Sequence, residues 1–184
     1  MQSIFCVAAI LFGSGLVSAP ILAQQPKATA DWGPFSFLVG EWSGEGAGKP
    51  GEASGGFSFA FELQGRVLVR RNYAEYPATK DKPGFRHDDL MVLYHESPSG
   101  AAEAGVKAIY FDSEGHVIHY RASLSEDQKT LTLQSEPVPS EPQYRFIYRR
   151  IDPTNMKFEF DIAPPGKPDG FSKYIEGSLR KKAG

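Results

Sequence analysis

Cysteine is almost absent from this 184-residue chain, and the single residue, Cys6, lies within an apolar N-terminal stretch. If that stretch is removed, no thiol remains, which excludes disulfide bonds, thiolate metal ligands and a cysteine nucleophile. Histidine is also scarce, with four residues, and no Asn-x-Ser/Thr sequon occurs. A formal net charge of −2 gives no electrostatic basis for binding nucleic acid.

Long uncharged apolar runs are missing except at the N-terminus, where one extends from Ile4 to Val17. It is too short for a comfortable membrane span, and Pro20 and a small-residue site follow it. These features predict a signal peptide, residues 1–23, cleaved after Ala23, with export to the periplasm or the extracellular space. Because no Lys or Arg precedes the run, a retained N-terminal anchor is the alternative.

The remaining length, about 160 residues, suits one domain with a sizeable core and leaves no room for a second. We expect residues 24–31 to be a flexible mature N-terminus and residues 32–182 to be that domain. After one helical segment at 32–39, apolar and polar residues alternate with period two, as in half-buried strands. The expected strands cover residues 42–49, 57–63, 67–76, 90–96, 106–112, 117–124, 129–135, 144–149, 156–162 and 172–179.

Short connections between about ten strands predict antiparallel pairing of sequence neighbours. An open sheet of this kind would expose two edges, whereas closure removes them. The expected fold is therefore all-β: an antiparallel up-and-down β-barrel of about ten strands with one short N-terminal helix closing one end. Gly40, which stops the helix, and Trp42, which opens the first strand, are assigned structural roles there. An immunoglobulin-type sandwich is the alternative, which the helix before the first strand disfavours.

Three longer connections contain two or three prolines each, at residues 77–89, 136–143 and 163–170. They are expected to be rigid surface loops. In a barrel they would surround the mouth, and the first is long enough to act as a lid.

Three short motifs carry a family resemblance. They are Phe35-x-Phe37-Leu38-x-Gly40-x-Trp42-x-Gly44-x-Gly46, the Gly65-x-Val67-x-Val69 hairpin, and Tyr110-Phe111-Asp112-x-x-Gly115 followed by a polar-aromatic strand. The chain resembles the lipocalin-like (calycin) barrels over its whole mature length. The closest group is the ten-stranded kind, which includes secreted bacterial domains of unknown function and, more distantly, nitrobindin-type haem proteins. This resemblance implies a barrel that holds a small hydrophobic or amphipathic ligand.

The resemblance does not extend to haem. In the nitrobindin branch a histidine near the C-terminal strands holds the iron, whereas the last histidine here is His119 and residues 171–182 contain none. We therefore expect no cofactor.

The histidines do not reveal a metal site either. His87 stands beside Asp88 and Asp89, but carboxylates adjacent in sequence rarely converge on one ion, so a solvated cluster is expected. His116 and His119 are three residues apart on a strand and point to opposite faces. The sequence also marks no pair of carboxylates as acid and base. We expect no metal and assign no catalytic residue.

The hairpin near residue 115 is the first candidate for polar groups inside the barrel. If Glu114-Gly115 forms a two-residue turn, Tyr110 lies opposite His119 and shares a face with Arg121. That face lies either in water or inside the barrel, where it would orient a polar ligand group. The register stays open at this point.

Neighbouring arginines provide a second candidate, because Arg70 and Arg71 place one guanidinium on each face of their strand. An inward guanidinium suits a carboxylate, and an outward one is ordinary surface charge. The expected aromatic wall comprises Phe57, Phe59, Phe61, Tyr144, Phe146, Tyr148, Phe158 and Phe160. The ligand-binding residues that we predict from the two polar candidates and this wall are Phe59, Phe61, Arg71, Tyr110, His119, Arg121 and Tyr148.

The predicted function is binding of a small hydrophobic or amphipathic molecule by an exported barrel protein. An enzyme acting on a lipophilic molecule is one alternative, and it would need His95 or His119 inward beside a carboxylate or a tyrosine. A structural envelope protein with a filled barrel is the other. We expect no nucleic-acid partner and no membrane span after signal cleavage, and the oligomeric state stays open.

Overall fold

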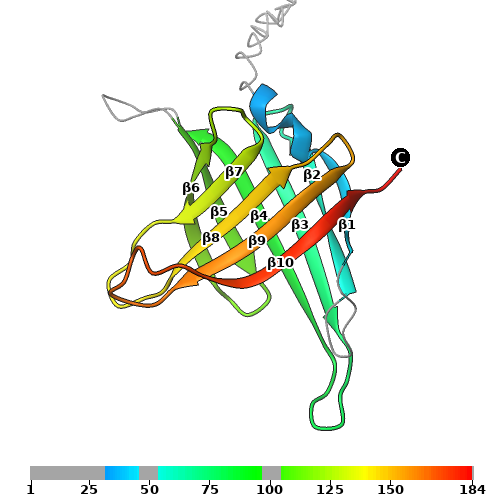
Figure 1. Cartoon of the computed structure of the whole chain (residues 1–184), viewed down its shortest axis with the longest axis vertical. Coiled ribbons are helices and arrows are strands. Elements are labelled where there is room, and N and C mark those ends of the chain that lie inside the picture. The colour runs from blue at the N-terminus through cyan, green and yellow to red at the C-terminus, as the bar shows by residue number, and fades with distance from the viewer. Residues whose placement is uncertain (1–31, 46–53, 97–104, 184) are drawn as a thin grey trace, which may run out of the picture.

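Ten antiparallel strands form one closed barrel in the computed structural model of this chain, which describes residues 32–45, 54–96 and 105–183 (Figure 1). The predicted signal peptide and the stretch 24–31 lie outside these residues. Within the described ranges, no helix combines the length and the apolar character needed to cross a membrane. The elements are η1 (Gly33–Leu38), β1 (Gly40–Glu45), β2 (Ser54–Glu62), β3 (Val67–Tyr76), β4 (Phe85–Glu96), β5 (Gly105–Asp112), β6 (Val117–Leu124), β7 (Thr130–Ser135), β8 (Gln143–Arg150), β9 (Asn155–Ala163) and β10 (Ser172–Lys181).

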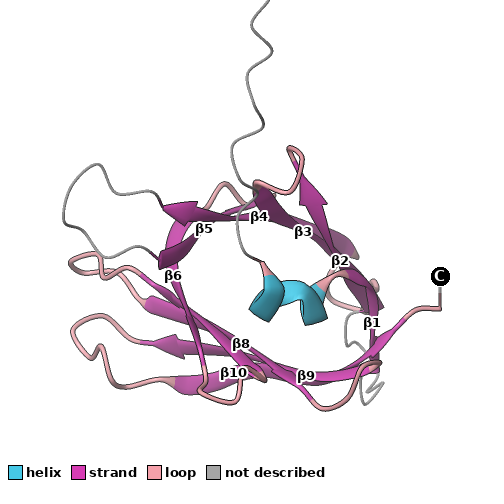
Figure 2. Ribbon diagram, turned by 90° about the horizontal axis from the view of Figure 1, so that it is seen from above, coloured by secondary structure: helices cyan, strands magenta, loops and turns pink. Residues whose placement is uncertain are grey.

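Each strand pairs with its neighbours in sequence, and β1 pairs with β10 to close the ring. The closing ladder joins residues 42–45 to residues 178–181. The prediction of an all-β, antiparallel, ten-stranded barrel is therefore confirmed. Figure 2 shows the ring from above, with η1 lying inside its outline.

The alternation seen in the sequence sorts side chains between the interior and the outer surface. The core includes these side chains, each at most 1% exposed: Leu38, Trp42, Phe59, Leu68, Met91, Leu93, Ala108, Tyr120, Leu131, Leu133, Tyr148 and Met156. Burial of each Leu or Phe side chain contributes about 1.5–3 kcal/mol, so this shared interior stabilises all ten strands together.

The N-terminal segment forms the short 3₁₀ helix η1, in which Phe35 and Leu38 are buried. Gly40 follows it with φ of 123°, a value that favours glycine because a Cβ would be strained there. The chain then enters β1, and the Trp42 indole N–H donates to the Leu38 carbonyl at 2.7 Å. Helix and first strand are thus tied together through Trp42.

Strand β4 begins at Phe85, five residues before the predicted start at residue 90. The expected loop 77–89 is therefore wrong over its second half, because residues 85–89 continue the ladder with β3 as far as Tyr76. The rings of Tyr76 and Phe85 stack at 4.4 Å in this extension. Residues 86–89 are polar or charged on both faces, so the sequence shows no apolar–polar alternation there that would predict a strand. Part of the predicted first strand, residues 46–49, lies outside the described residues.

The predicted register of the β5–β6 hairpin is wrong by one residue. Tyr110 pairs with Ile118, and Ile109 pairs with His119. The reason is a longer turn, in which Asp112 Oδ1 accepts the backbone N–H groups of Glu114 and His116 at 3.1 and 2.9 Å. Such a slip exchanges the two faces of a strand, so the side chain of Tyr110 shares its face with Ile118 instead of His119.

The Trp42→Phe substitution should lower the free energy of unfolding by about 2 kcal/mol, because it removes a buried hydrogen bond and leaves a void. Urea denaturation followed by circular dichroism measures this loss. Val117→Ala, at a side chain that is 58% exposed on the outside, should change stability by less than about 0.5 kcal/mol. Equal losses for the two variants would contradict a structural role for Trp42.

Candidate functional site

A buried ion pair lies inside the barrel between Arg70 on β3 and Asp89 on β4. Both side chains are only 4% exposed. Asn72, which lies directly across the ladder from Asp89, donates its amide N–H to Asp89 Oδ2 at 2.7 Å. Paired and hydrogen-bonded charges of this kind are tolerated in an interior, whereas a single charge is not.

Aromatic rings enclose the Arg70 guanidinium. Its central carbon lies 5.1 Å from the ring centre of Phe57 and 5.7 Å from that of Phe146, within the range of cation–π attraction. Burial opposes the charged form, but interactions with Tyr148 and Asp89 outweigh it and raise the pKa of Arg70 above its ordinary value. The guanidinium therefore stays charged.

Three buried polar atoms, one in this guanidinium and two on tyrosines that interact with its charge, have no hydrogen-bond partner among the described residues. They are Arg70 Nε and the hydroxyl oxygens of Tyr120 and Tyr148. Burial raises the pKa of Tyr148 to about 12, with Arg70 partly opposing it, and burial also raises the pKa of Tyr120. Both phenols stay protonated near neutral pH. Among the described residues, the region of Arg70 thus holds three hydrogen-bond donors without acceptors.

A second set of polar side chains, Tyr110 and His87, lies between this ion pair and the turn that joins β5 to β6. The Tyr110 hydroxyl lies 3.3 Å from His87 Nε2, and Asp89 Oδ2 lies 3.4 Å from the same nitrogen. Burial and the charge of Asp89 raise the pKa of Tyr110. Partial burial lowers the pKa of His87, but Glu114 and Asp89 outweigh it, so the net shift is upward. The interior ion pair and the turn are connected through His87.

Several apolar side chains near Tyr110 are only partly buried. Ile118, Tyr144 and Phe160 face inward with the core residues but remain partly exposed. The Phe160 ring lies 4.6 Å from that of Phe146, whose ring also contacts Arg70. An aromatic wall therefore runs from the buried charges toward the end of the barrel away from η1.

Four of the predicted ligand-binding residues lie on the inner face. Phe59, Tyr110 and Tyr148 are buried there. Phe61 also faces inward, but it lies at the η1 end, is 41% exposed and contacts the Trp32 ring at 6.1 Å.

The other three predicted residues point outward. Arg71 is 58% exposed and pairs with Glu62, so Arg70, not Arg71, supplies the inward guanidinium. His119 is exposed, and Arg121 binds Glu136 at 3.2 Å. Arg71, His119 and Arg121 therefore lie on the outer surface, away from the interior ion pair, and their part in ligand binding stays a prediction.

The sequence reasoning missed Arg70, Asp89 and Tyr120. Val69 and Leu68, which precede Arg70, are both buried, so the apolar pattern of β3 does not tell its inner face from its outer one. Asp89 was hidden in the expected loop. Tyr120 shares a strand face with Ile118, so the sequence pattern could have placed it inward. The wrong register, however, put Tyr110 on the opposite face from Tyr120.

Comparison with known proteins adds no assignment. Neither the scan against protein-family models nor the search of curated proteins gave a match. The chemistry of the barrel interior is therefore the basis on which a function is inferred.

The Arg70→Met substitution should lower the free energy of unfolding by about 3–5 kcal/mol, because it leaves the Asp89 carboxylate buried without its counter-charge. Arg71→Met is the matched control, one residue away on the opposite face, and should cost less than about 1 kcal/mol. Chemical denaturation of the two variants side by side measures the difference. Equal costs would contradict the inward placement of Arg70.

Alkaline pH should destabilise the barrel through its buried phenols. Tyr148 keeps its proton up to about pH 12 when folded, whereas in the unfolded chain it releases it near pH 10.0. The stability that depends on protonated Tyr148 is therefore fully present below pH 10.0. It is lost as the pH rises from 10.0 toward about 12, because the unfolded chain releases this proton first. Thermal melts across this window, with tyrosinate absorbance, test this, and Tyr148→Phe should flatten the decline. A decline unchanged in that variant would contradict the assignment.

Proposed function

We propose that this chain is an exported, lipocalin-like barrel that binds a small amphipathic molecule. The apolar part of the ligand lies along the wall that includes Phe146 and Phe160, and its head group binds at Arg70, Tyr120 and Tyr148. The observation that carries the proposal is the set of three buried donors without acceptors near Arg70, among aliphatic and aromatic core side chains. Leaving such groups unsatisfied costs about 1–3 kcal/mol each, which a bound acceptor would offset.

The donors define the chemistry of the head group. The charge of Arg70 is already balanced by Asp89, so the site does not require a full negative charge. It requires an oxygen that accepts hydrogen bonds, as in a carboxylate, an ester or a hydroxyl group. An ammonium group has no lone pair to offer and would be a poor fit.

The N-terminal segment and the leader complete the proposal. Helix η1 acts as the plug of one end, held by Trp42, and the ligand enters from the opposite end. The leader, residues 1–23, directs export and is cleaved after Ala23. The similarity of the Gly40-x-Trp42-x-Gly44 segment to that of lipocalin-like barrels supports this arrangement.

Catalysis is the main alternative, and one observation favours it: His87 lies beside Asp89 and Tyr110. The histidines that we first considered are less suitable: His119 is exposed, and the buried His95 Nε2 has no hydrogen-bond partner among the described residues, with its ring 4.6 Å from that of Trp32. Binding is the preferred function because the unsatisfied donors lie around Arg70 and need an acceptor, which a ligand provides without any reaction.

The double substitution Tyr120→Phe with Tyr148→Phe should weaken binding by about tenfold, since two hydrogen bonds are worth about 0.5–1.5 kcal/mol each. The probes are lauric acid, methyl laurate and dodecylamine, each competing with a fluorescent fatty acid. The acid and the ester should bind more tightly than the amine.

The urea stability of the double variant distinguishes a ligand-binding role of the two tyrosines from a purely structural one. The double variant should unfold at the same or a higher urea concentration, because it removes polar atoms that lack partners. Tyr174→Phe, at a side chain that is 68% exposed, is the control and should change neither quantity. Native mass spectrometry of the exported protein should also show a bound small molecule. A bare mass together with no binding of any probe would overturn the proposal.

A further inference from the structure

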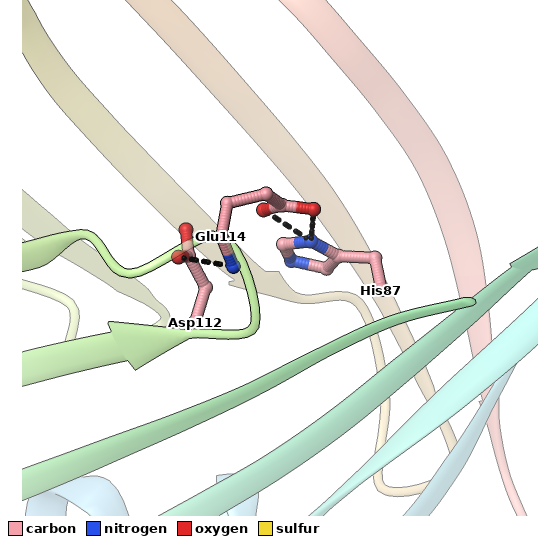
Figure 3. A group of neighbouring side chains, drawn as sticks. All are labelled: His87, Asp112 and Glu114. Atoms are coloured by element: carbon pink, nitrogen blue, oxygen red, sulfur yellow. Dashed lines mark hydrogen bonds and ion pairs between the residues drawn. The ribbon is translucent and has the colours of Figure 1, made fainter. Parts of the chain in front are cut away.

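A second cluster of polar side chains lies at the end of the barrel away from η1. His87, Asp112 and Glu114 each offer one ligand atom, and these atoms lie within 4.8 Å of one another (Figure 3). His87 Nδ1 lies 2.8 Å from Glu114 Oε2. The residues come from β4, from the end of β5 and from the turn that follows, so three separate backbone positions converge.

The backbone holds these positions firmly. Asp89 pairs with Asp112 in the β4–β5 ladder, and the Ser113 N–H continues the ladder by donating to the Asp88 carbonyl at 2.9 Å. Asp112 Oδ1 accepts backbone N–H groups of the turn, while Oδ2 pairs with the exposed ring of His116, at 2.8 Å. That ring can move away and release the oxygen.

His87 has the environment of a metal-binding histidine. Metal-bound imidazoles commonly donate their second N–H to a carboxylate, which fixes the tautomer and the ring orientation. Here Nε2 faces Asp89 Oδ2 at 3.4 Å, and Asp89 is itself held by Asn72 and Arg70. In the metal-free chain Nδ1 donates to the Glu114 carboxylate, and a cation that binds at Nδ1 displaces this proton to solvent while Nε2–H stays directed at Asp89.

We propose that His87, Asp112 and Glu114 bind a borderline divalent cation such as Zn²⁺. One imidazole nitrogen and two carboxylate oxygens are ligands that Zn²⁺ accepts, whereas Ca²⁺ requires six to eight oxygens. Adjacent ligands around tetrahedral Zn²⁺ stand about 3.4 Å apart, so a small contraction of the cluster is sufficient. A fourth position stays free for water or for a ligand group.

Metal binding is tested on the mature protein, freed of any affinity tag and dialysed against a chelator. Isothermal titration with Zn²⁺ should show one site per chain, and Co²⁺ should give the visible absorption of a low-coordinate site. The melting temperature should rise on addition of Zn²⁺. His87→Ala and Glu114→Gln should each weaken binding by about tenfold or more, with circular dichroism confirming the fold.

His119→Ala is the matched control, because this histidine is exposed on the outer face of β6 and lies outside the cluster. It should bind Zn²⁺ as the unsubstituted protein does. Equal affinity in His87→Ala and the unsubstituted protein, or weakening only in His119→Ala, would overturn the proposal. Because the readout is metal affinity, it is independent of whether fatty-acid probes bind inside the barrel.

Discussion

The ion pair between Arg70 and Asp89 sets the arrangement of the barrel interior. A buried charge needs a counter-charge and hydrogen bonds. In surroundings of low polarity, a polar group without a hydrogen-bond partner lowers the stability of the fold. Asn72 donates a hydrogen bond to Asp89, and the rings of Phe57 and Phe146 lie within cation–π distance of Arg70. These contacts demand one register between β3 and β4, so the pair favours specificity of the fold more than its stability.

Asp89 belongs to two environments at once. One oxygen faces Arg70 in the interior, and the other faces Asn72 and His87 toward the end of the barrel. The proposed ligand site and the proposed cation site are therefore neighbours that share one carboxylate. They differ in chemistry: the inner site presents donors, and the outer one presents acceptors around an imidazole.

The strand count, the antiparallel order and the inward aromatics of β2, β8 and β9 followed from sequence, because period-two alternation reports which face is buried. The site was less predictable. Arg70 could not be told from Arg71 where both faces of β3 are apolar, and the turn that sets the place of Tyr110 depends on hydrogen bonds of Asp112. The contact of His87 with Glu114 joins β4 to the turn between β5 and β6, which residue spacing along one strand cannot reveal.

The closing ladder between β1 and β10 has a consequence for how the protein folds. Every other pairing joins strands that follow one another in sequence, but this one joins residues 42–45 to residues 178–181. Bringing such distant segments together carries the largest loss of chain entropy, so this ladder is expected to form last. Before it forms, β1 and β10 each have one unpaired edge, and such edges are where a partly folded chain would associate with other chains.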